Sequence, residues 1–472
     1  MENRNRIAAD RQTAIPTRKA AKRLFVAFLA TGFMVTPALG QQKGVLPKNT
    51  PGKPTPLAGS PKESASDRFS DKEKRQEKAR EVYADAANAQ NNGAFPIAIV
   101  QWNKLLKEYP ADPLASSARH FLGICYLQQE KPDFQAAIEQ FRISLRDTKV
   151  KQREESLVNL GWCLYQQGIL ADGNDRKQSL SESAKVLSAL IEMYPDGSFA
   201  DKAMFYAGEA ESRLGNLDKA NSHYSQLLQN HSMDTSTVRP DALFGLALTF
   251  DQQQQPILAK ENYDAFLAKY AGHPLAKEVR LRASEIALQD DLVEEAVQLL
   301  KQVVASKDFE NSSNADYALY RYGFALAKSG KFKESAEIYQ KLATQFPKSQ
   351  YSQNSSLAAG QTLMRDKKYD EALKAFALLL AAKDEQAAEA AHWMCQIVIV
   401  QSKPADAIPI ARKALEWGSK TSSAVLLKMD LADGLSAIPD GKAEARTLYE
   451  QIAVENPDDT IAPTDRAAKA AL

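Results

Sequence analysis

Apolar side chains recur at intervals of three and four residues along the chain after about residue 72. This spacing is that of an α-helix with one apolar face, and the alternation with β-branched residues that is typical of a strand is absent. Within residues 317–342, the pattern predicts a helix over 317–326, a turn over 328–331 and a second helix over 336–342. Gly330 suits the left-handed position just after the first of these helices. We therefore expect an all-α protein built from helix pairs.

One phrase returns about every 35 to 47 residues: a small residue, then an aromatic residue, then a further apolar residue. The clearest copies are Ala98/Trp102/Leu105, Ala220/Tyr224/Leu227, Ala259/Tyr263/Phe266, Ala336/Tyr339/Leu342, Ala372/Phe376/Leu379 and Ala445/Tyr449/Ile452. Several copies end in Tyr-Pro or Phe-Pro, as at Pro110 and Pro347, and the residue before a proline is disfavoured in a helix. A phrase with this period is typical of a structural unit that stacks on copies of itself.

Six glycines fall near the middle of the first helix of a predicted pair, where each costs about 1 kcal/mol relative to alanine. They are Gly123, Gly161, Gly208, Gly245, Gly323 and Gly360. A common cause is close approach between the two helices of a pair. We expect such a glycine to face the alanine of the second helix, as with Gly208 and Ala220, while the aromatic residue fills the gap to the next pair.

The order of these residues resembles the tetratricopeptide repeat, in which Trp/Leu-Gly-x-x-Tyr is followed by Ala, Phe/Tyr and Pro. The match is best in residues 200–230, 314–347 and 351–382, and the turns are enlarged, most of all between Gly168 and Leu180. The resemblance implies a right-handed α-solenoid of about ten helix-turn-helix repeats over residues 72–472, with the first helices lining a concave groove. Helix-pair repeats of related families are the alternative.

In this family, groove-facing residues fall one and five places after the small residue of each first helix. The candidates for contact with a protein ligand are Trp162, Glu209, Arg213, Phe250, Phe324, Lys328 and Arg365. Aromatic anchors mixed with cations suit a peptide segment. The alternative is that these are ordinary exposed residues or residues that pack between repeats.

The two ends of the chain are predicted to lie outside the repeats. Residues 1–40 combine seven basic residues, an apolar run over 24–35 and small residues at Ala38 and Gly40, which predicts a secretory signal cleaved before Gln41. An uncleaved anchor is the alternative, but the run is shorter than the ~20 residues of a bilayer span, so no stable span is expected after cleavage. Residues 41–71 are rich in Pro, Lys and Ser and are predicted to be a disordered linker or, alternatively, a polyproline ligand. Residues 460–472 are predicted to form a short capping helix.

Composition and motifs disfavour several classes of function. Lys+Arg number 60 and Asp+Glu 59, so no overall positive field favours nucleic acid. The five histidines form no metal-ligand pair, and neither a nucleophile motif nor a phosphate loop nor a dinucleotide fingerprint is present, so we expect no catalytic residue, no metal and no cofactor. Cys125, Cys163 and Cys395 are expected to be buried small residues that form no disulfide.

The function predicted from these features is that of an exported, non-catalytic scaffold in a Gram-negative-type envelope, which binds a protein or peptide partner along its groove. The alternatives are an envelope-assembly or division accessory factor that recognises cell-wall polymer or nascent outer-membrane protein, and the recognition subunit of an enzyme complex. The repeats resemble those of the barrel-assembly lipoprotein and the Tol-Pal-associated division coordinator. The lipid-anchoring Cys of the first and the long heptad segment of the second are missing, and the oligomeric state stays open.

Overall fold

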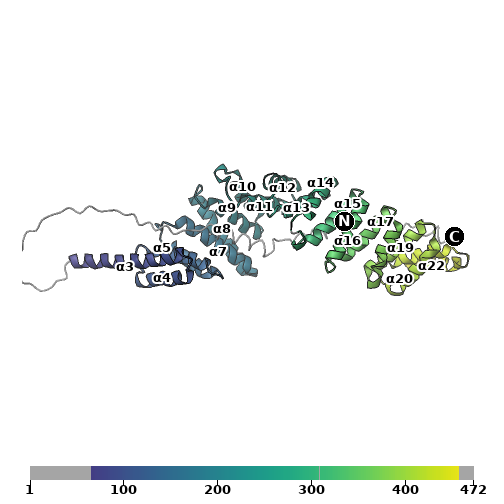
Figure 1. The fold of residues 1–472 in the computed structure, drawn as a ribbon, viewed down its shortest axis with the longest axis horizontal. Helices are drawn as coiled ribbons and strands as arrows, with labels where there is room; N and C mark the ends of the chain where they lie inside the picture. The colour runs from purple at the N-terminus through teal and green to yellow at the C-terminus, as the bar shows by residue number, and fades with distance from the viewer. Residues whose placement is uncertain (1–64, 308, 456–472) are drawn as a thin grey trace, which may run out of the picture. The chain divides into compact units, whose positions relative to one another are not determined.

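All regular structure in the described part of the chain is helical. The computed structural model describes residues 65–307 and 309–455, and the predicted signal (1–40), residues 41–64 of the predicted linker and the predicted capping helix (460–472) lie outside these residues. Twenty α-helices and five short 3-10 helices, with no strand among the described residues, confirm the all-α solenoid (Figure 1). The odd-numbered helices are the first helices of the predicted repeats and the even-numbered ones are the second helices.

The described helices fall into two compact units that divide after Gln253. Unit 1 contains α3 (Ala65–Asn91), α4 (Phe95–Glu108), α5 (Ala115–Leu127), α6 (Phe134–Ser144), α7 (Arg153–Leu170), α8 (Gly173–Met193), α9 (Ala200–Arg213), α10 (Leu217–Gln229) and α11 (Arg239–Gln252). Unit 2 contains α12 (Pro256–Tyr270), α13 (Ala276–Gln289), α14 (Val293–Val304), α15 (Ala315–Lys328), α16 (Phe332–Gln345), α17 (Ser352–Arg365), α18 (Tyr369–Ala377), α19 (Glu385–Val400), α20 (Ala407–Gly418), α21 (Ala424–Ser436) and α22 (Lys442–Glu455).

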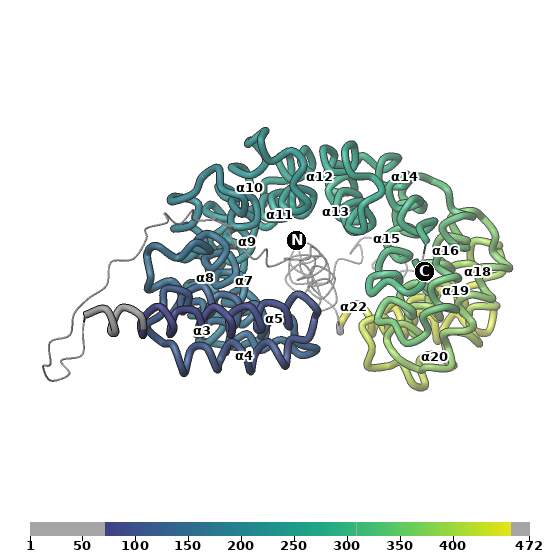
Figure 2. The backbone as a smooth tube through the Cα atoms, turned by 60° about the vertical axis from the view of Figure 1, so that its left-hand side comes forward, coloured from purple at the N-terminus to yellow at the C-terminus, as the bar shows by residue number. Residues whose placement is uncertain are grey.

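Within each unit, first and second helices lie on opposite sides. In unit 1, α9 contacts both α7 and α11, and in unit 2, α19 contacts both α17 and α21. The second helices pack mainly against the first helices before and after them. In Figure 2, α7, α9 and α11 lie on one side of unit 1 and α8 and α10 on the other. Successive first helices therefore lie next to one another from α7 to α11 in unit 1 and from α17 to α21 in unit 2, as the repeat pattern predicts.

Five of the six mid-helix glycines make room for an aromatic ring, and Gly161 makes room for Leu187. A Cβ atom on Gly208 would lie 2.6 Å from the Tyr224 ring, and one on Gly245 would lie 2.7 Å from the same ring. Gly323 stands in the same relation to Tyr339, again at 2.6 Å. The predicted close approach is confirmed, but the predicted partner is wrong: the glycine faces the aromatic residue of the second helix. The ring of Tyr224 thus lies in the space between two successive first helices.

The turn within several helix pairs has a common hydrogen-bond geometry. Gly330 has a φ of +78°, and the next amide, Lys331 N–H, donates to Leu326 O at 2.9 Å. This bond spans the end of α15 as in a Schellman motif, which confirms the prediction for Gly330. The same bond closes the turn after α17, where Lys367 takes the left-handed position (φ +60°) and Lys368 N–H donates to Leu363 O at 2.9 Å.

Two predicted boundaries are wrong because helix formation needs less apolar surface than we assumed. Helix α3 begins at Ala65, inside the predicted linker, because the segment after Pro61 is rich in Lys, Glu, Gln and Arg, which are good helix formers. The segment between Gly168 and Leu180, predicted as an enlarged turn, is also mostly helical. There α7 continues to Leu170 and α8 begins at Gly173.

Carboxylates at the start of first helices connect successive repeats. Glu154 Oε1 accepts a hydrogen bond from Phe199 N–H at 2.8 Å. Asp201 Oδ2 accepts one from Ser236 Oγ at 2.6 Å, and Asp316 Oδ2 accepts one from Ser349 Oγ at 2.6 Å. Each acceptor lies seven residues before the mid-helix glycine of its own helix, so the register of the repeat extends to its polar residues.

The three cysteines are buried and free, as predicted. Burial raises the pKa of the Cys125 thiol to about 12 and that of Cys163 well above its ordinary value. They therefore behave as small core residues.

Candidate functional site

The seven predicted groove residues divide between the two units. Trp162, Glu209, Arg213 and Phe250 belong to unit 1 and Phe324, Lys328 and Arg365 to unit 2. Each unit therefore has its own first-helix surface.

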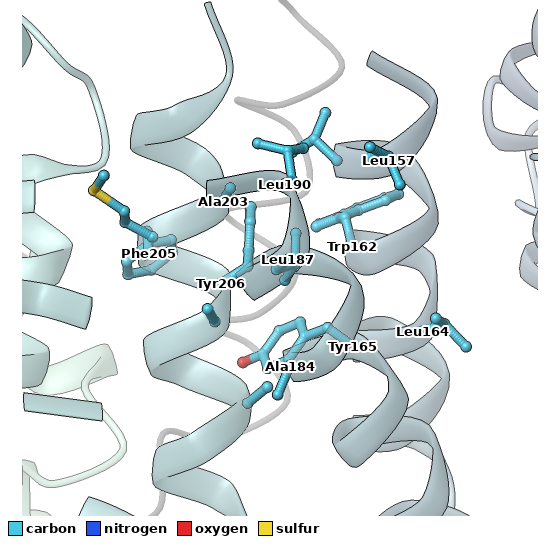
Figure 3. Close-up of a cluster of buried hydrophobic side chains, with 14 of the residues drawn as sticks. Leu157, Trp162, Leu164, Tyr165, Ala184, Leu187, Leu190, Ala203, Phe205 and Tyr206 are labelled. Carbon is cyan, nitrogen blue, oxygen red and sulfur yellow. The ribbon is translucent and has the colours of Figure 1, made fainter. Parts of the chain in front are cut away.

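Trp162 is part of the core, so its prediction as a ligand-contacting residue is wrong. Its side chain is only 1% exposed. The indole of α7 points toward Ala203 and Tyr206 of α9 (Figure 3). Because Ala203 is small, the neighbouring helix leaves room for the large ring, and the ring fills the space between the two repeats. Phe250 is half-buried and packs against the hydrophobic core of the same unit.

Glu209 is the centre of a hydrogen-bonded network that we call the unit 1 cluster: Tyr165, Glu209, Arg213 and Tyr224. The Tyr165 hydroxyl donates to Glu209 Oε2 at 2.9 Å, and the Tyr224 hydroxyl donates to Oε1 at 2.8 Å. Arg213 Nε donates to the Tyr165 hydroxyl at 2.9 Å. Burial, and then the negative charge of Glu209, raise the pKa of both tyrosines. Both carboxylate oxygens thus have partners within the protein.

Asp241, in the first turn of α11, adds a second carboxyl group beside this cluster. Burial, and then the charge of Glu209, raise the pKa of Asp241 to about 7. The group therefore changes charge near neutral pH, whereas an ordinary aspartate is fully ionised there.

On α15, the corresponding surface is a stripe of residues at helical spacing. Tyr317, Arg321, Phe324 and Lys328 follow one another at intervals of four, three and four residues, so they share one face of the helix, and Tyr320 lies beside Arg321 at its edge. Phe324 is 40% exposed, and the Cζ atom of Arg321 lies 5.0 Å from the centroid of its ring. Arg321 Nε in turn donates to Glu285 Oε1 of α13 at 2.7 Å. One face of the phenyl ring is therefore covered by a fixed guanidinium group.

Two tyrosines of α15 pack against Tyr351, the residue before α17. The rings of Tyr320 and Tyr351 stack with centroids 5.2 Å apart, and Tyr317 lies 5.5 Å from Tyr351. Burial and the charge of Glu285 raise the pKa of Tyr317. We call Glu285, Tyr317, Tyr320, Arg321, Phe324 and Tyr351 the unit 2 cluster. Phe324 is the exposed apolar member of this cluster.

The two remaining predicted residues lie at the margin of the unit 2 cluster. Lys328 Nζ pairs with Asp291 Oδ1 at 2.6 Å, and both side chains are exposed. Arg365 is exposed at the last residue of α17. Its charge, with that of Arg321, acts on Tyr339, whose pKa burial raises. Both arginines therefore lie near the Tyr339 ring that fits beneath Gly323.

Glu285 and Tyr351 are cluster members that the sequence rule missed. The rule depended on a mid-helix glycine, and α13 has Ser284 in that place. Ser284 precedes Ala296 by twelve residues, the spacing of Gly208 and Ala220 and of Gly360 and Ala372. A rule that accepted any small residue would have found Glu285. Tyr351 lies before α17, outside the positions that the rule considers.

A histidine in unit 1 has partners of the kind used in nucleophilic catalysis. His120 Nδ1 lies 2.8 Å from Ser156 Oγ, and its Nε2 lies 3.4 Å from Glu155 Oε2. Both His120 and Ser156 are fully buried, so this arrangement offers no access to a substrate. Across the described residues, no group of three or more His, Cys, Asp or Glu is placed to hold a metal ion. None of the described helices has the length and apolarity needed to cross a bilayer.

Models of known protein families match part of the chain. Two models described as tetratricopeptide repeat match the chain, one over residues 202–232 and 317–349 and the other over 244–315. The chain therefore contains tetratricopeptide repeats within these residues. Proteins with this repeat are generally non-catalytic scaffolds for protein interactions, and some bind peptides.

Solved tetratricopeptide repeat structures align with much of the chain. A protein from Parabacteroides merdae ATCC 43184 covers 60% of this chain and 99% of its own, at 17% identity and a TM-score of 0.35. The C-terminal part of a repeat protein from Cytophaga hutchinsonii covers 56% and 98%, at 14% identity and a TM-score of 0.40. YrrB, described as having an unusual peptide-binding site, covers 44% and 93%, at 17% identity and a TM-score of 0.34. A comparison with curated proteins gave no match.

Proposed function

We propose that this protein is an exported, non-catalytic scaffold that binds a segment of a partner protein on the first helices of unit 2, with Phe324 at the centre of the contact. The supporting observation is that Phe324 stays 40% exposed on the first-helix surface, with the guanidinium of Arg321 fixed over one face of its ring. A rigid aromatic side chain that remains open to solvent is the kind of anchor on which binding energy concentrates.

Position 324 can be tested by photocrosslinking. Phe324 is replaced by p-benzoylphenylalanine, the protein is expressed in its cell of origin, and the envelope fraction is irradiated. The matched control carries the same group at Leu378, an 80% exposed apolar residue at the end of α18. We expect a discrete crosslinked protein from position 324 and none from position 378. Equal crosslinking from both positions would contradict the proposal.

The crosslinked segment then provides a quantitative test. It is identified by mass spectrometry, synthesised as a peptide and titrated against the unmodified protein, Phe324→Ala and Leu378→Ala. We expect Phe324→Ala to weaken binding at least about fivefold, as loss of a central anchor does, and Leu378→Ala to leave it unchanged. Equal affinity for all three proteins would move the binding site to another surface.

Export is the second part of the proposal, and it is supported by the basic, apolar and small-residue segments of residues 1–40. The test is N-terminal sequencing of the protein recovered from a Gram-negative host. We expect the first residue to be Gln41, and a chain that retains Met1 and stays in the cytoplasm would contradict export.

A further inference from the structure

We infer that the segment bound at the unit 2 cluster carries an aspartate or glutamate side chain next to its apolar anchor, and that Arg365 binds this carboxylate. The inference rests on the proposed function, because it names the chemistry of the partner segment at the same surface.

Several cations on and beside the Phe324 surface have carboxylate partners within the protein. Arg321 pairs with Glu285 at 2.7 Å, and Lys328 pairs with Asp291 at 2.6 Å. On the next repeat, Asp366 pairs with Lys368 at 3.1 Å. Each of these cations thus has a carboxylate partner within the protein. An exposed cation of α17 differs from them among the described residues.

That cation is Arg365. It is exposed at the end of α17, and none of the carboxylates in the described residues forms an ion pair or hydrogen bond with it. A guanidinium group offers a planar pair of N–H donors that matches a carboxylate, so its natural complement in a ligand is a single Asp or Glu. Charge complementarity therefore assigns the partner one acidic side chain at this end of the site.

Arg365 also lies in the right part of the surface to act together with Phe324. Both Arg365 and Arg321 are near enough to Tyr339 to influence its pKa. The Tyr339 ring lies directly beneath Gly323, the residue before Phe324. The ring of Tyr320 on α15 stacks at 5.2 Å on that of Tyr351, the residue before α17, and Phe324 and Arg365 follow the small residues of α15 and α17 by one and five places. An extended segment that crosses from α15 to α17 would meet the ring first and the guanidinium next.

A glycan strand is the other polymer that an aromatic surface can bind, but this geometry disfavours it. Sugar recognition uses the open faces of aromatic rings, and here Tyr320 and Tyr351 stack on each other while Arg321 covers one face of Phe324. The remaining open ring is single, and it suits one side chain of a peptide better than a row of sugars.

The test is selection from a random library of 12-residue peptides, displayed with amidated C-termini, on the immobilised full-length protein. Peptides that also bind Phe324→Ala are discarded by counter-selection. We expect the remaining peptides to share an apolar residue with a neighbouring Asp or Glu. Replacement of that residue by Asn or Gln should weaken binding about fivefold at low salt, and the difference should shrink as salt screens the pair.

Variants assign the carboxylate to Arg365. Arg365→Gln should bind the acidic peptide and its amide version equally, and Arg365→Lys should retain part of the difference. The matched control is Arg446→Gln, which removes an exposed arginine from α22, a second helix of the same unit. It should bind both peptides like the unmodified protein.

The outcomes separate the inference from the proposed function. Phe324-dependent peptides that carry no acidic residue, or that discriminate equally well after Arg365→Gln, would overturn the inference and leave the proposed function intact. A selection that yields no Phe324-dependent peptide, or binding of soluble peptidoglycan fragments in place of peptides, would overturn both.

Discussion

Helices α9 and α15 present the same register of positions to the first-helix surface, yet one surface is closed and the other is open. Counted from Gly208 and Gly323, Glu209 corresponds to Phe324 and Arg213 to Lys328. In unit 1 the charged residue is surrounded by partners from its own protein, whereas in unit 2 the phenyl ring stays exposed. The comparison teaches that the repeat fixes where a side chain lies, while the residues of neighbouring helices decide whether it remains available to a ligand.

The largest loss of stability should come from filling the space between a mid-helix glycine and a tyrosine ring, which both units contain. Leucine at position 208 or 323 would place its side chain inside the ring of Tyr224 or Tyr339. We expect Gly208→Leu and Gly323→Leu each to lower the free energy of unfolding by about 3 kcal/mol. Gly272→Leu is the control, since a Cβ there has no heavy atom within 4 Å. Urea unfolding measures all three, and an unchanged midpoint for Gly208→Leu would refute the packing argument.

Replacing Glu209 should disrupt the unit 1 cluster and leave the unit 2 cluster intact. Glu209→Ala removes the acceptor of two tyrosine hydroxyl groups, one of them on the fully buried Tyr224. Because these buried hydroxyl groups would lose their hydrogen-bond acceptor, the free energy of unfolding should fall by about 2 kcal/mol. Phe324→Ala, at the equivalent position, should cost less than about 1 kcal/mol because the ring is partly exposed. Equal losses would mean that the two surfaces do not differ as we describe.

The carboxyl group of Asp241 should make the stability of unit 1 depend on pH. Its folded-state pKa of about 7 lies above the ordinary value of 3.8, so the folded protein holds the proton more tightly than the unfolded chain. Its contribution to stability therefore decreases as pH rises from about 4 to 7 and is constant above that range. Asp241→Asn should flatten this decrease and stabilise the protein by about 1 to 3 kcal/mol at pH 8. Identical pH profiles for the variant and the unmodified protein would refute the assignment.

The smallest change in stability should come from replacing Arg213 or Lys328, the two cations at equivalent positions of α9 and α15. Arg213 donates to the buried Tyr165 hydroxyl, whereas Lys328 pairs with an exposed aspartate. Arg213→Gln should lower the free energy of unfolding by about 1 kcal/mol, and Lys328→Gln should change it by less than about 0.5 kcal/mol. Thermal unfolding of both variants at the same ionic strength measures the difference, and a larger loss for Lys328→Gln would reverse our comparison.

The sequence predicted the scaffold well because the repeat phrase describes contacts within and between neighbouring helices. The burial of Tyr224 and Tyr339 and the turn at Gly330 follow from local spacing. The site was harder to predict, because Trp162, Glu209 and Phe324 occupy the same position in three repeats and have three different environments. Ala203, Tyr165 and Arg321 create those environments from other helices or from the preceding turn, and spacing alone does not reveal their effect.

Hydrogen exchange of the intact protein, with and without a Phe324-dependent peptide, tests the central claim most directly. The two surfaces are compared in one sample, so differences in stability between variants do not enter. We predict that the bound peptide slows amide exchange in α15 and α17 and leaves exchange in α9 unchanged. Protection in α9 without protection in α15 would contradict the assignment of the open surface to unit 2.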